Sequence, residues 1–324
     1  MSTSAGTVPR SARLGLLQVC AAGVLWGTGG LVVSVVRERD GLGALTVSAW
    51  RMALAAVSLV AFAALTGRSR GVVQAMRSRP VAAVAVGCGT AVYQGLYFVS
   101  VLLVGVSVAT VVALGLAPVL AAAWEHLAAR TGPTYREVGV LAAALVGLVL
   151  ISVDPGYGAA PAGGRPVLGL VLAVASGATY AATTVLGHRL AQSVDPIALT
   201  TCATAAGSLL LAPFLVVAVM TGAPVLPTGA ASAALLVYLG VATMALSYGL
   251  LYAGLRTTSG SAATVATLVE PLSAAVLAAL VLGERLGASG LLGGALILTA
   301  VVALRPGQDG HLALAGSPSD GARC

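Results

Sequence analysis

The chain has 324 residues, of which 58% are hydrophobic and 8% are charged, and its mean hydropathy is +1.00. About a quarter of the residues in a soluble globular domain are charged, so this composition excludes that class and indicates a polytopic membrane protein. The formal net charge of +7 does not indicate a nucleic-acid partner, because the arginines are scattered through short segments without interleaved aromatic residues.

Apolar runs of about 20 residues, separated by short charged or Pro/Gly breaks, predict ten transmembrane helices. The predicted spans are 14–36, 42–66, 80–103, 107–129, 136–153, 167–187, 196–220, 230–254, 260–282 and 288–304. We expect residues 1–13 and the polar residues 305–324 to be terminal segments outside the bilayer, and residues 67–79 to be a loop. Asp195 followed by Pro196 predicts a capped helix start.

Arginine placement predicts the orientation of these helices. With a cytoplasmic N-terminus, 12 of the 17 arginines fall on the cytoplasmic side, four fall outside, and Arg51 lies within a span. Loops rich in arginine stay in the cytoplasm, so both termini are expected to be cytoplasmic in a multi-pass plasma-membrane protein.

The two halves of the chain resemble each other. Residues 14–153 and 167–304 form the predicted repeats, joined by a Gly-, Pro- and Ala-rich linker at 154–166. Trp26 aligns with Tyr180 at an offset of 154 residues, and Pro118 aligns with Pro271 at an offset of 153. Because each repeat holds five helices, the second is inverted relative to the first. Inverted repeats with helices interrupted by proline, here at Pro118 and Pro271, are typical of secondary carriers, whose site lies near the midplane.

Several segments carry a resemblance to a known family. They are AAGVLWGTGGLV (21–32), Arg51, LGLAP (114–118) and LVEPLSAAVLAALVLGERLGASGLLGGALILTAVV (268–302). Through them the chain resembles the ten-helix drug/metabolite transporters built from two EamA domains, over about residues 14–304. The resemblance implies an exporter of amino acids, related metabolites or small amphipathic compounds. It also implies that the fifth and tenth helices pack together, away from the substrate path.

Two charged residues are predicted at the same depth in the membrane. Arg51 and Glu270 each lie about ten residues into a span, which places both roughly 15 Å deep. A carboxylate at this depth usually faces a cavity, so Glu270 is a candidate substrate or proton site. The alternatives are a structural kink at Glu270 and an Arg51 that extends to the membrane surface. The first repeat has Ala117 where the second has Glu270, and Thr131 where the second has Glu284, so acid-dependent coupling would rest on the second half.

Tyrosines recur at helical spacing in corresponding spans. Tyr93 with Tyr97, and Tyr248 with Tyr252, each form an i, i+4 pair on one helix face. With Trp26, Gln94 and Tyr180 they form a candidate lining for a small-molecule cavity. Alternatively, the tyrosines hydrogen-bond between helices, and Tyr252 could be an interfacial anchor.

The sequence offers little for catalysis or cofactors. His126, His188 and His311 lie far apart, the cysteines have no metal-ligand spacing, and the absence of lysine excludes a nucleotide-binding GxxxxGK[ST] loop. We therefore predict no enzyme activity, no metal and no cofactor. A gradient is the expected energy source, with protons as the candidate coupling ion. A passive facilitator or channel and, less favoured, a membrane-embedded enzyme are the alternatives. The partners expected are the bilayer and a small-molecule substrate, with no nucleic acid, in a monomer or homodimer.

Overall fold

The computed structural model describes residues 10–153, 165–281 and 287–304, and these residues form helices and turns with no strand. The all-helical membrane fold predicted from the sequence is confirmed. Nine helical segments in the described residues are long and apolar enough to span a membrane, and a tenth is shorter. The first repeat contains α1 (Arg10–Asp40), α2 (Ala44–Leu65), α3 (Ser69–Ser78), α4 (Pro80–Val104), α5 (Val106–Ala129) and α6 (Tyr135–Ser152). The second contains α7 (Pro166–Ala191), α8 (Pro196–Met220), α9 (Ala230–Gly240), the π-helical η1 (Val241–Leu246), α10 (Ser247–Gly254), α11 (Gly260–Ala266), α12 (Val269–Val281) and α13 (Ala288–Ala303).

Some sequence predictions concern residues outside these ranges. They are the terminal segments 1–9 and 305–324, most of the linker, and Glu284.

The stretch 67–79 is not a simple loop as expected. It contains the ten-residue helix α3, which begins after Arg68 and ends before Arg79. α3 is too short and too polar to cross a bilayer, so it does not appear as an apolar run in the sequence. Its apolar side packs on α8, and this contact makes the helix stable where its length alone would not. The predicted cap at α8 is confirmed, since the Asp195 carboxylate accepts hydrogen bonds from the backbone N–H groups of Ile197 and Ala198.

The ninth span is interrupted just before Glu270. α11 ends at Ala266 and α12 begins at Val269, so Glu270 lies in the first turn of α12. Pro271 has no N–H to donate to the carbonyl one turn earlier. That carbonyl, of Thr267, instead accepts a 2.9 Å hydrogen bond from the backbone N–H of Glu270 in a tighter turn.

The counterpart proline behaves differently, which corrects the prediction of a helix break at Pro118. α5 continues through Pro118 from Val106 to Ala129. Ala117 and Pro118 are both buried among neighbouring helices. A proline in a membrane helix removes one hydrogen bond, and packing against neighbours can preserve the helix around it. The interruption is therefore a property of the second half.

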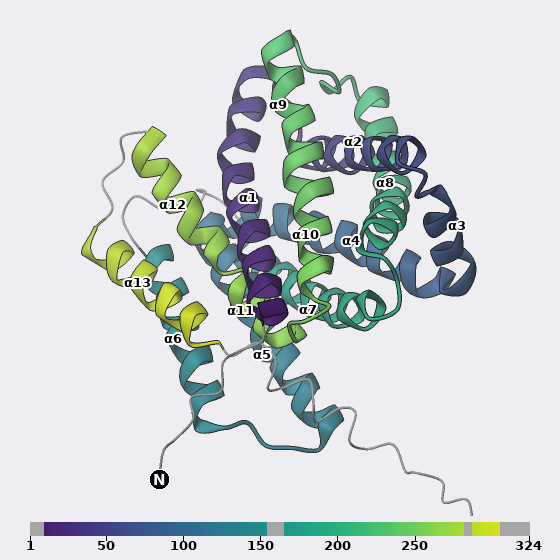
Figure 1. Ribbon diagram of the computed structural model, residues 1–324. Coiled ribbons are helices and arrows are strands. Elements are labelled where there is room, and N and C mark those ends of the chain that lie inside the picture. The colour runs from purple at the N-terminus through teal and green to yellow at the C-terminus, as the bar shows by residue number, and fades with distance from the viewer. Residues whose placement is uncertain (1–9, 154–164, 282–286, 305–324) are drawn as a thin grey trace, which may run out of the picture.

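Helix contacts follow the symmetry of the two repeats. α2 packs on α8, α5 on α11, and α6 on α13, so counterpart helices meet each other. α1 contacts α10 and α12, and in the same way α7 contacts α4 and α5. Figure 1 shows α6, α12 and α13 on one side of the bundle and α2, α3 and α8 on the other. Each half therefore builds its core largely against the opposite half.

Glycines allow the closest of these approaches. A Cβ atom built at Gly147 of α6 would lie 2.7 Å from the Gly293 carbonyl oxygen of α13, and one at Gly293 would lie 2.6 Å from the Gly147 carbonyl oxygen. Real Cβ atoms do not come this near to backbone, so both positions require glycine. The expected contact between the fifth and tenth helices is present.

Candidate functional site

Aromatic side chains from both repeats meet inside the bundle. The rings of Trp26 on α1 and Tyr248 on α10 have centroids 5.0 Å apart. The rings of Tyr180 on α7 and Tyr93 on α4 are stacked, with centroids 4.8 Å apart. Each contact joins one repeat to the other, and the two contacts are counterparts of each other, because Trp26 aligns with Tyr180 and Tyr93 with Tyr248.

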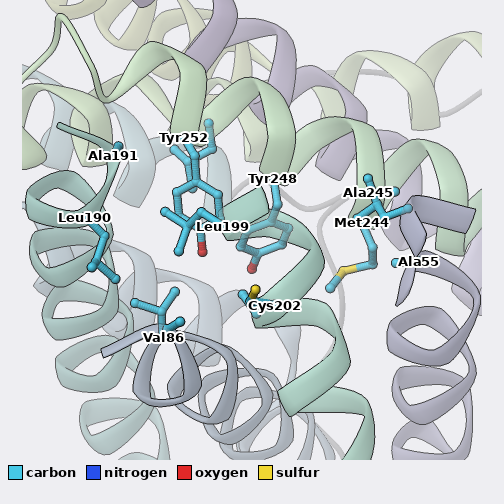
Figure 2. Close-up of a cluster of buried hydrophobic side chains, with 14 of the residues drawn as sticks. Ala55, Val86, Leu190, Ala191, Leu199, Cys202, Met244, Ala245, Tyr248 and Tyr252 are labelled. Carbon is cyan, nitrogen blue, oxygen red and sulfur yellow. The ribbon is translucent and has the colours of Figure 1, made fainter. Parts of the chain in front are cut away.

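The remaining tyrosines of the predicted set extend both pairs along their helices. Tyr97 lies 6.4 Å from Tyr93, ring centroid to ring centroid, and its hydroxyl is 2.7 Å from the Thr110 hydroxyl. Tyr252 lies 6.1 Å from Tyr248 and is 2% exposed. Tyr252 is therefore not an interfacial anchor. Its position on the inward face of the helix, one turn beyond Tyr248, removes it from the surface. In Figure 2, Tyr248 and Tyr252 project from one helix toward Cys202 and Val86.

Arg51 is held inside the protein. Its side chain is 8% exposed, and its guanidinium donates a 3.1 Å hydrogen bond to the Thr243 hydroxyl. Thr243 lies in η1, and its hydroxyl in turn donates to the Leu239 carbonyl at 2.6 Å. No described residue accepts a hydrogen bond from Arg51 Nε. These contacts exclude an arginine that extends to the membrane surface, and they leave part of the guanidinium without a protein partner.

Glu270 lies within electrostatic range of Arg51 and of Tyr93, Tyr97, Tyr180 and Tyr248. Among the described residues the two charges do not form an ion pair within 4.0 Å, because Arg51 is bonded to Thr243 instead. Glu270 is only partly buried, although the eight residues before it are fully buried. In a region of low dielectric, two opposite charges still attract each other strongly even without direct contact. The Glu270 carboxylate has no ion-pair partner within 4.0 Å among the described residues.

Gly27 fixes the approach of the segment that carries Glu270. A Cβ at Gly27 would lie 2.6 Å from the Glu270 carbonyl oxygen and 2.7 Å from the Cβ of Ser273. α1 therefore touches the first turn of α12 directly, which sets the position of the acid.

Gln94 is buried on α4, next to Tyr93 in sequence. Neither its amide nitrogen nor its amide oxygen has a hydrogen-bond partner among the described residues. An unpaired buried amide costs about 1 to 3 kcal/mol, so such a group is normally retained for a polar contact. Among the described residues, the Gln94 side chain makes no hydrogen bond to the aromatic residues.

Threonines are the part of this region that the sequence analysis missed. Besides Thr243, Thr267 accepts a 3.0 Å hydrogen bond from the Tyr180 hydroxyl and links α7 to the interrupted span. A small cavity beside Tyr248 and Tyr252 is lined in part by Thr90, Thr200 and Thr204, from α4 and α8. The available signal was the occurrence of Thr243 and Thr267 in the interiors of apolar spans, where a hydroxyl needs a partner.

Comparison with known proteins agrees with this architecture. The model of the EamA-like transporter family matches residues 13–153 and again residues 167–305. The chain is 28% identical over 228 residues to "Uncharacterized transporter YwfM" of Bacillus subtilis strain 168, covering 69% of this chain and 71% of the relative. It is 26% identical over 293 residues to "Uncharacterized inner membrane transporter YicL" of Salmonella typhimurium strain LT2, covering 90% of this chain and 95% of the relative.

A solved crystal structure superposes with a TM-score of 0.71 at 19% identity, covering 89% of this chain and 95% of that one, a likeness of fold alone. With two matched repeats, a bundle of membrane-spanning helices and transporter relatives, the chain is a multi-pass membrane protein that belongs to the EamA-like transporter family.

Proposed function

We propose that this chain is a secondary active transporter that exports amino acids, related metabolites or small amphipathic compounds by alternating access, with protons as the coupling ion at Glu270. One observation carries the proposal: a cation, an acid and paired aromatic rings, contributed by both repeats, lie together in the interior of the bundle. A site shared between inverted repeats changes its exposure when one repeat moves against the other.

Each part of this region has a chemical role in the proposal. The rings of Trp26, Tyr93, Tyr180 and Tyr248 offer apolar area and π faces to a small amphipathic solute. Arg51, held by Thr243, offers its free donors to an anionic group. Glu270 binds either a proton or a cationic group, but not both. Competition for one carboxylate is the simplest way to exchange protons for substrate.

The orientation in the proposal is the one that the arginine distribution predicts, with both termini in the cytoplasm. Protons would then enter with their gradient as substrate leaves the cell.

The test is uptake into inverted membrane vesicles with an imposed pH gradient, using a panel of radiolabelled amino acids and amphipathic metabolites. Wild type is compared with Glu270→Gln. Glu38→Gln, at an exposed position near the end of α1, is the matched control. We expect a solute that accumulates with the gradient in wild type and control, and equilibrates without accumulating in Glu270→Gln.

Two results would contradict the proposal. Full gradient-driven accumulation by Glu270→Gln would rule out this residue as the coupling site. Absence of counterflow, in which external unlabelled solute accelerates loss of internal labelled solute, would favour a passive pore over a carrier.

A further inference from the structure

α3 is a short basic helix at the surface of the bundle. Arg70 and Arg77 lie within it, Arg68 and Arg79 lie at its two ends, and all four are exposed. The chain has no acidic residue between Asp40 and Glu125. α8, the helix that α3 packs against, carries no acidic residue, and the carboxylate of Asp195, which precedes α8, caps that helix. The four arginines therefore form a concentrated positive charge without a neutralising acid on their own segment.

This helix is fixed to the membrane-spanning core. Ala75 is 4% exposed, and Val72 packs against the main cluster of buried residues. The Cys202 thiol of α8 lies 3.8 Å from the Val72 carbonyl oxygen. These contacts hold α3 against the start of α8 and next to the start of α4, as Figure 1 shows. α3 therefore lies at the ends of the spanning helices, at the level of a bilayer surface.

The remaining faces of α3 divide into apolar and basic sides. Val73 is 49% exposed and Met76 is 37% exposed, and neither packs into the protein core. At about 100° per residue, Arg70 and Arg77 point within about 20° of each other, roughly 10 Å apart along the helix axis. An apolar side next to a basic side is the pattern of helices that lie in a membrane interface.

We propose that α3 is an interfacial helix that binds the headgroups of anionic phospholipids through Arg70 and Arg77. Val73 and Met76 enter the upper acyl region, and the two guanidinium groups contact phosphates of neighbouring lipids. Arginine suits this role because its planar fork donates two hydrogen bonds to one phosphate. The inference does not depend on the proposed transport function.

The test is native mass spectrometry of the full-length protein in detergent, titrated with phosphatidylglycerol and with phosphatidylcholine of the same acyl chains. Wild type should bind phosphatidylglycerol more tightly than phosphatidylcholine. A basic residue near an anionic surface contributes about fivefold in binding, so Arg70→Gln with Arg77→Gln should reduce the preference by up to about 30-fold at low ionic strength. Arg70→Lys with Arg77→Lys keeps both charges but not the planar fork, so it should reduce the preference less than the glutamine pair does.

The matched control is Arg13→Gln with Arg130→Gln, which removes two exposed arginines predicted to lie on the same membrane side but leaves α3 intact. It should keep the wild-type preference. Equal binding of both lipids by wild type, or an equal loss in the control pair, would overturn the proposal. Should the glutamine pair fail to insert, salt provides the same test in wild type, whose preference must fall as ionic strength rises.

Discussion

Substitution of Gly27 by alanine tests whether the close contact of α1 with α12 positions Glu270. The added methyl group would lie 2.6 Å from the Glu270 carbonyl oxygen and 3.0 Å from the Ala274 backbone nitrogen, so one of the two helices must move. Overpacking of this kind costs about 1 to 3 kcal/mol. Alanine recovers about 0.5 to 1 kcal/mol in a helix interior, so we expect a net loss of about 0.5 to 2 kcal/mol.

Gly30→Ala is the matched control on the same helix, because a Cβ at Gly30 has no heavy atom within 4 Å. Purified variants are compared by thermal unfolding in one detergent and by transport in vesicles. Gly27→Ala should unfold at a lower temperature than wild type, and Gly30→Ala should unfold at the same or a slightly higher one. The transport rate of Gly27→Ala should fall as well. If both variants match wild type in stability and rate, the contact does not constrain the position of Glu270.

Three further predictions concern side-chain hydrogen bonds, two within the site and one at the end of α1. Thr243→Val removes the acceptor of Arg51 while keeping a similar volume, and loss of a hydrogen bond to a charged group should lower the free energy of unfolding by about 1.5 to 3 kcal/mol; Thr243→Ser should restore most of it in chemical denaturation. Tyr180→Phe loses the hydroxyl bonded to Thr267 but keeps the ring stacked on Tyr93, so a loss of about 0.5 to 1.5 kcal/mol is expected, against about 3 to 5 kcal/mol for Tyr180→Ala; equal losses would show that the ring contributes little. Asp40→Ala leaves the backbone N–H and the hydroxyl of Thr228 without their acceptor, which should loosen this segment and increase proteolysis near residue 228, whereas unchanged cleavage would refute a restraining role for Asp40.

The sequence predicted the spans and much of the aromatic region because both depend on local periodicity. Apolar runs mark spans regardless of tertiary contacts, and a duplicated chain shows its internal symmetry in one sequence. The i, i+4 spacing of Tyr93 with Tyr97 and of Tyr248 with Tyr252 placed each pair on one helix face. The alignment of Trp26 with Tyr180 then indicated equivalent positions.

Other features depend on contacts that a local pattern does not encode. Arg51 and Thr243 are far apart in the chain, and their hydrogen bond requires α2 to pack on η1. Pro118 and Pro271 occupy equivalent positions in sequence and both are buried, yet of these two spans only the one with Pro271 is interrupted, so the proline by itself does not determine the break. α3 is too short to be a span, and the helix is stable only because its apolar side packs on α8, a contact that the local sequence does not reveal.

The fusion of both repeats in one chain has a consequence for how such a protein can evolve. In an antiparallel pair of identical subunits, every mutation appears twice, so an acid gained at one position is gained at its counterpart as well. Here Glu270 has Ala117 as its counterpart, and one substitution alters one half alone. A single gene can therefore retain a twofold framework of helix contacts while specialising one half for charge.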